Sequence, residues 1–148
     1  MKRILKVLLV IFVLFTLSAC GGKTILTDNE IKDKLTEMGF DVNEITDSIE
    51  DSNISIVRTA NNRTYQIEYY VFKNDESAKL AFENNMKMFK ANKKYKGKLK
   101  SAKNYDKYIQ ETNDYYNVVS RNKNILIYVS VNIDNKKDVK KVLNKLGY

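Results

Sequence analysis

The chain has 148 residues, with 26 lysines and arginines against 18 aspartates and glutamates, and its net charge is +8. It contains no histidine, and Cys20 is its one cysteine. Nucleophile systems that rely on histidine and the usual zinc and copper sites are therefore excluded, and no disulfide can form within the chain.

The first twenty residues follow the pattern of an export signal. An apolar run occupies residues 7–17, and the small residues Ser18 and Ala19 then lead to Cys20. Three basic residues precede the run: Lys2, Arg3 and Lys6. The run is shorter than the roughly 20 apolar residues that a membrane-spanning helix needs. A basic start, an apolar run and a small-residue end are typical of a secretory signal peptide.

The stretch Leu17-Ser18-Ala19-Cys20 resembles the lipobox of bacterial lipoproteins. The resemblance implies that residues 1–19 are a signal peptide, cut between Ala19 and Cys20. It further implies that Cys20 carries a diacylglycerol thioether, whose two acyl chains, such as palmitate, anchor the protein at the extracytoplasmic face of the cell membrane. The alternative is a plain signal anchor with an incidental cysteine.

Residues 20–26 are expected to be a lipidated tether, and residues 27–148 a single domain. Thr27 and Glu30 form a capping box, and Ile31, Leu35 and Met38 recur on one helical face. Gly39 is expected to end this first helix in a left-handed conformation. The acidic stretch at 40–52 is interpreted as a solvated connection.

Two strands are expected next, at 53–59 and 64–72, with a tight turn at Asn61-Asn62. A second helix follows from about residue 75 to 92. Its inward stripe consists of Ala78, Ala81, Phe82, Met88 and Phe89. The lysine-rich stretch 93–103 is interpreted as a loop.

Strands at 105–112, 115–121 and 124–132 come next, and the last, which is the most apolar, is expected at the centre of the sheet. A third helix starts near Asp134 or Asn135 and ends before Gly147. Short turns between consecutive strands indicate antiparallel pairing. The predicted fold is therefore α+β, an antiparallel sheet of about five strands with packed helices in the order α-β-β-α-β-β-β-α.

Nine lysines lie between residues 87 and 107, with only Asp106 as a nearby acid. For a membrane-tethered domain, anionic lipid or a cell-wall polymer is a natural partner of such a run, whereas nucleic acid is not expected. A solvated surface is the alternative. The candidate contact residues are Lys87, Lys90, Lys93, Lys94, Lys96, Lys98 and Lys100, followed by Lys103 and Lys107.

A tyrosine-bearing face of the sheet is the second candidate site. Tyr70, Tyr116 and Tyr128 are predicted to lie opposite the main apolar set, together with Glu68. An uncovered face of this kind would bind a small ligand or a protein. A helix lying over it would make the tyrosines structural instead.

The sequence contains no phosphate-binding glycine loop and no calcium-binding loop of the common kind. We expect no catalytic residues, metal or cofactor, and favour a non-enzymatic binding or interaction module with a protein partner that the sequence does not identify. The alternative is an accessory lipoprotein that binds a small ligand or substrate on the tyrosine-bearing face. The rest of the chain, rich in Lys, Asn and Ile, resembles small lipoproteins of low-GC Gram-positive bacteria.

Overall fold

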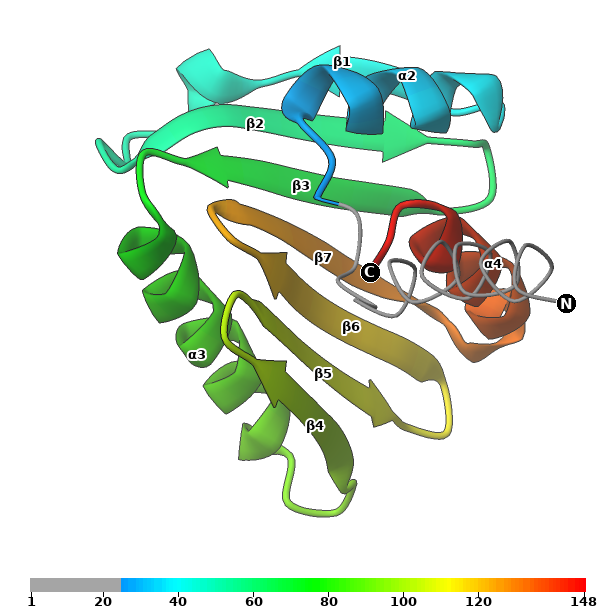
Figure 1. Cartoon of the computed structure of the whole chain (residues 1–148). Helices are drawn as coiled ribbons and strands as arrows, with labels where there is room; N and C mark the ends of the chain where they lie inside the picture. The colour runs from blue at the N-terminus through cyan, green and yellow to red at the C-terminus, as the bar shows by residue number, and fades with distance from the viewer. Residues whose placement is uncertain (1–24) are drawn as a thin grey trace, which may run out of the picture.

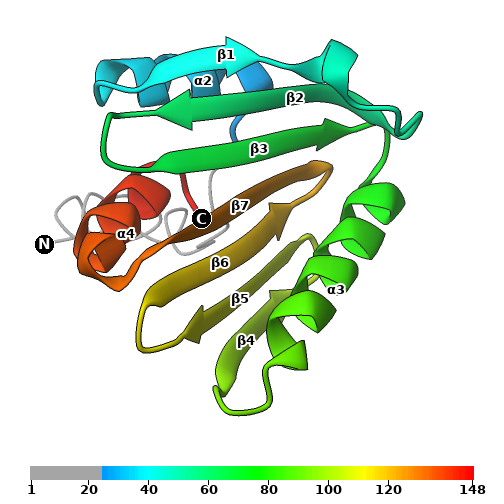
Figure 2. The same ribbon diagram turned by 180° about the vertical axis from the view of Figure 1, so that it is seen from behind.

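A computed structural model describes residues 25–148, which form a seven-stranded antiparallel sheet in the order β1-β2-β3-β7-β6-β5-β4 (Figure 1). Helices α2 (Asp28–Glu37) and α4 (Lys136–Lys145) lie on one face of the sheet, here called the α4 face. Helix α3 (Asp75–Ala91) lies on the other, the α3 face (Figure 2). The strands are β1 (Asp41–Glu44), β2 (Ile54–Asn61), β3 (Gln66–Phe72), β4 (Gly97–Ala102), β5 (Tyr105–Glu111), β6 (Tyr115–Asn122) and β7 (Ile125–Asn132).

The α+β class, the antiparallel pairing and the three predicted helices are confirmed, and β7 is the central strand. The strand count was wrong, because two edge strands were predicted as loops. Strand β1 lies in the stretch interpreted as a solvated connection, and β4 in the lysine-rich stretch. Edge strands tolerate charged side chains, which also discourage pairing with other chains. The first hairpin also turns later than predicted, because Asn61 pairs with Gln66 and Arg63 takes a positive φ of 69°.

Helix α2 begins and ends as its sequence indicates. The amide of Thr27 donates to Glu30 Oε2 at 2.8 Å, and the amide of Glu30 donates back to Thr27 Oγ1 at 3.4 Å. At the other end Gly39 has φ +85°, and the amide of Phe40 donates to the carbonyl of Leu35 at 3.0 Å. This left-handed cap turns the chain back towards β1.

The core has two layers, one on each face of the sheet. On the α4 face, apolar side chains of β3, β6 and β7 pack against Leu35 of α2 and Leu143 of α4. On the α3 face, Phe72, Tyr108, Val119 and Leu126 pack against Ala78 and Phe82 of α3. Strand β7 supplies buried residues to both layers, which explains its continuous apolar run.

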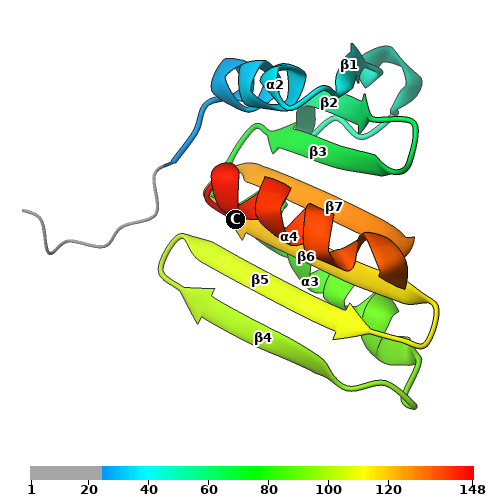
Figure 3. The same ribbon diagram turned by 90° about the vertical axis from the view of Figure 1, so that its right-hand side faces the viewer.

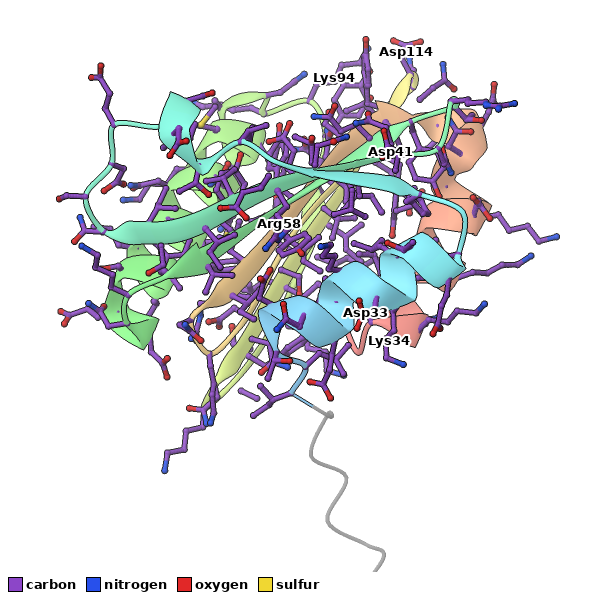
Figure 4. The ribbon with its side chains drawn as sticks, turned by 90° about the horizontal axis from the view of Figure 1, so that it is seen from above. Asp33, Lys34, Asp41, Arg58, Lys94 and Asp114 are labelled. Atoms are coloured by element: carbon purple, nitrogen blue, oxygen red, sulfur yellow. The ribbon has the colours of Figure 1, made fainter. Side chains whose placement is uncertain are left out.

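Arg58 of β2 joins three elements on the α4 face. Its guanidinium donates to both carboxylate oxygens of Asp28, at 3.0 and 2.9 Å, and lies 2.9 Å from Glu44 of β1. The hydroxyl of Tyr69 on β3 also donates to Asp28, at 3.0 Å. Figure 4 shows Arg58 between the sheet and α2, with Asp33 and Lys34 on the helix. The network therefore fixes α2 and β1 to the sheet.

Burial alone would raise the pKa of Asp28, but hydrogen bonds from Arg58 and Tyr69 and the charge of Arg58 lower it below its ordinary value. A lowered folded-state pKa stabilises the protein above the unfolded pKa near 3.8, and this contribution is lost as pH falls through the lower, folded value. The ion pair is thus fully effective at neutral pH.

We predict that Arg58→Ala lowers the free energy of unfolding at pH 7 by about 2 kcal/mol, because it leaves the half-buried Asp28 without its charged partner. Urea denaturation at pH 7 and near pH 3 measures the effect. The difference from the wild type should shrink at the lower pH, where Asp28 takes up a proton. Arg63→Ala, at an exposed arginine, is the control and should change stability by less than about 0.5 kcal/mol. Equal losses in the two variants would contradict the role given to Arg58.

Candidate functional site

A groove runs along the side of α3 that faces β3 and β7. Two cavities of about 340 and 530 Å³ form it, and because Met88 and Tyr128 line both, the cavities adjoin. The sheet supplies the floor and α3 supplies one wall. The first cavity is lined by Glu68, Tyr70, Leu126 and Asn85, and the second by Tyr95, Tyr115, Asn117 and Ser130, among others.

The groove exists because α3 is the single α-helix among residues 25–148 that covers this face. Phe82 and Phe89 of α3 pack towards β5, β6 and β7, where Phe89 stacks on Tyr108 and Tyr128. The start of α3 covers only the end of β3, where Phe72 packs against Ala78 and Phe82. The rest of β3 and the neighbouring β2 have no α-helix above them on the α3 face (Figure 2). The apolar rings beside α3 are only partly covered.

Glu68, Tyr70 and Tyr128 form the polar centre of the first cavity. Glu68 and Tyr128 are direct partners across the β3–β7 ladder. The hydroxyl of Tyr70 donates to Glu68 Oε2 at 2.5 Å, and the side-chain amide of Gln66 donates to Glu68 Oε1 at 2.8 Å. The carboxylate is therefore held in one orientation at the groove.

Both tyrosines of this centre keep their protons at physiological pH. Burial raises the pKa of Tyr70, and the hydrogen bond to Glu68 and the charge of Glu68 raise it further. Burial and the charge of Glu68 also raise the pKa of Tyr128. The groove thus holds one carboxylate beside two neutral phenols, which suits binding by aromatic contact and hydrogen bonding.

The groove is acidic although the protein is basic. The charged residues that line the two cavities in the described part of the chain are Asp51, Glu68 and Asp114, with no lysine or arginine among them. The carboxyl end of α3 lies at the second cavity, where Gln110 donates to the carbonyls of Phe89 and Tyr95 at 2.8 and 3.0 Å. A helix carboxyl terminus carries partial negative charge. Both cavities therefore favour a cation.

The structure brings together three of the four residues predicted for the tyrosine-bearing face. Tyr70, Tyr128 and Glu68 line one cavity, but the placement of Tyr116 with them was wrong. Tyr116 pairs with Val131 and is fully buried in the layer on the α4 face. Side chains of a strand alternate between faces, so its neighbours Tyr115 and Asn117 face the groove instead.

Met88, which was predicted on the inward stripe of α3, is a groove residue. Its side chain is 70% exposed and lies at the junction of the two cavities. The sequence contains a pattern that indicates this exposure. Phe82 and Phe89 are seven residues apart and share one helical face, whereas Met88 does not fall on that face. Asn85, three residues before Met88, lies on the same side of the helix and also lines the groove.

The candidate lysines do not form one surface. Lys87 and Lys90 belong to α3, and Lys93, Lys94 and Lys96 lie in the segment between α3 and β4. Lys90 lies over the ring of Tyr108, 5.4 Å from its centroid. Lys98 and Lys100 are on β4, opposite Ile109 and Lys107 of β5, and so point to the α4 face.

Ala19 and Cys20, the predicted cleavage and lipidation residues, lie outside the described residues. Within residues 25–148, no helix has the length and apolar character needed to cross a membrane. The same residues contain no group of three or more acidic or cysteine side chains placed to hold a metal ion. Comparison of the chain with protein families, with curated proteins and with solved structures found no match.

We predict that Tyr116→Phe raises the free energy of unfolding by up to about 1 kcal/mol, because its buried hydroxyl has no hydrogen-bond partner among the described residues. Burial, followed by the charge of Glu111, raises the pKa of Tyr116 to about 12, which agrees with a desolvated phenol. The matched control is Tyr69→Phe, which removes a donor to Asp28 and should lower stability by about 1 kcal/mol. Thermal unfolding of both variants measures the difference. A loss of stability in Tyr116→Phe equal to that in Tyr69→Phe would refute the assignment.

Proposed function

We propose that this protein is a membrane-anchored, extracytoplasmic binding protein and that the groove beside α3 is its ligand site. The observation that carries the proposal is the pairing of exposed aromatic and methionine surface with an oriented carboxylate in one groove. Pockets that combine apolar walls with a few convergent polar groups are the usual form of a ligand site. No step of covalent chemistry is assigned to it.

The lining indicates the class of ligand. Glu68, Asp51 and Asp114 together with the carboxyl end of α3 attract positive charge. Tyr70, Tyr128 and Met88 offer rings and a thioether to an apolar or cationic group. We therefore propose a ligand that joins an amine or guanidinium to an apolar or aromatic part, either as a small molecule or as a side chain of a peptide.

The proposed location rests on the signal pattern and on Cys20. The folded part begins soon after that cysteine, since Leu26 is already buried beside α2 and α4. The seven residues from Cys20 to Leu26 span at most about 25 Å when extended. A lipid on Cys20 would therefore hold the domain close to the membrane, and the groove would sample ligands there.

We predict that phenethylamine, a cationic aromatic probe, binds the groove more tightly than hydrocinnamate, which has a similar ring and chain but a negative charge. Amide chemical shifts in ¹⁵N-labelled protein would report binding near Glu68, Asn85 and Tyr128. Glu68→Gln should weaken phenethylamine about tenfold, because an interaction with a charged group contributes about 1.5 kcal/mol or more. Because glutamine has nearly the same shape as glutamate, this substitution should leave the fold intact.

Glu83→Gln is the matched control for this experiment. Glu83 lies on the opposite side of α3, in a separate cavity beside β4, and its replacement removes the same charge. Phenethylamine binding should remain as in the wild type. Equal affinity for the two probes, or equal losses in both variants, would overturn the proposed ligand class.

We predict that Cys20→Ser abolishes labelling of the protein by a radioactive fatty acid and blocks lipoprotein-type processing, because serine provides no sulfur for the thioether. Labelling of cells followed by gel electrophoresis measures this outcome. Ala91→Ser, a replacement at an exposed residue of α3, should be labelled as the wild type is. Unchanged labelling and membrane retention of Cys20→Ser would refute the anchor.

A further inference from the structure

The chain enters the fold on the α4 face. Ile25 is exposed, and Leu26, the next residue, is buried with the side chains of α2 and α4. Figures 1 and 3 show the first described residues leading into α2 on the side of the sheet where α4 lies. If Cys20 is anchored as proposed above, this side of the domain is the one that the tether brings to the membrane.

The same side carries a group of exposed lysines, here called the lysine patch. Lys137 and Lys141 lie on α4, opposite its buried residues Val139 and Leu143. The β4 lysines point to this face because their partners on β5 do. The patch consists of Lys98, Lys100, Lys137, Lys140, Lys141 and Lys145. Its α4 members lie outside the lysine run at residues 87–107.

Two acids near the patch are engaged in contacts of their own. Asp138 accepts a hydrogen bond from the hydroxyl of Tyr65 at 2.7 Å, and Glu111 pairs with Lys136 at 2.5 Å. Residues 25–51, which hold nine acids and two lysines, form α2 and β1 at the β1 edge of the sheet. Helix α2 shares the α4 face but lies over the half of the sheet away from β4, and its Glu37 lines a cavity together with Lys145 of the patch. The charge is thus separated along the sheet, and an anionic surface would attract the half made of α4, β4 and β5.

We infer that the lysine patch docks on the anionic phospholipid headgroups of the membrane and orients the domain there. The inference rests on the proposed lipid anchor, which brings the patch within reach of the headgroups. Lys87, Lys93 and Lys94 belong to α3 or to the segment after it, and Figure 4 places Lys94 on the side away from α2. In the docked orientation the groove beside α3 faces away from the membrane and stays open to ligands.

The test is sedimentation of the lipid-free chain, residues 21–148, with vesicles of phosphatidylglycerol and phosphatidylcholine, and with vesicles of phosphatidylcholine alone. This chain contains every helix and strand that the structure describes. The wild type should bind only the anionic vesicles. The triple variant Lys100→Gln, Lys137→Gln and Lys141→Gln should lose about tenfold or more in vesicle affinity, the scale expected for lysines at an anionic surface.

The matched control is Lys87→Gln, Lys93→Gln and Lys94→Gln, which removes the same total charge at exposed positions. This control variant should lose less than about threefold in vesicle affinity, because salt screens the interaction of the membrane with charges that lie more than a Debye length away from it. Equal losses of vesicle affinity in the two triple variants would overturn the inference that the lysine patch docks on the membrane. So would absence of vesicle binding, or binding to a soluble polyphosphate polymer but not to vesicles. The vesicle experiment uses a chain without Cys20, so its result does not depend on the lipid anchor. Phenethylamine binding tests the groove separately. Failure of the lysine patch can therefore be told apart from failure of the proposed function.

Discussion

A seven-stranded sheet has two faces. The apolar side chains on each face are buried from solvent where a helix packs over them. In residues 25–148 the α4 face has two α-helices and the α3 face has one. The α4 face is therefore closed over a continuous core. On the α3 face the cover ends along one side of α3, and the groove lies at that margin. The position of the groove is thus a consequence of how the helices are divided between the faces.

The surface beside α4 and β4 differs in charge from the groove beside α3. Arg58, Asp28 and Glu44 are used to fasten α2 and β1 to the sheet, so these charges are compensated within the fold. The lysines of β4 and α4 are exposed on the α4 face, whereas the groove on the other face is lined by carboxylates. One domain therefore presents a basic surface and an acidic groove on opposite sides. The basic surface suits an anionic membrane surface, and the acidic groove suits a cationic ligand.

The candidate site could be predicted in part. Glu68 and Tyr70 are two residues apart on one strand, so their common face follows from the alternation of β3 alone. Strand β6 carries polar and apolar residues at both even and odd positions, and its pattern does not decide which set is buried. Its pairing with β7 decides this, since Tyr116 lies opposite Val131 and Val119 opposite Tyr128. A shift by one residue would have exchanged the two faces.

The sequence by itself determined the α+β class, the three helices, the central place of β7 and the shared face of Glu68 and Tyr70. Each of these depends on local signals, namely caps, periodicity and apolar runs. Only the tertiary structure decided that β1 and β4 are strands, that Tyr116 is core, and that the lysines divide between two sides of the domain. The physical reason is that edge strands and charged surfaces obtain their partners from distant parts of the chain. Local propensity carries little information about such partners.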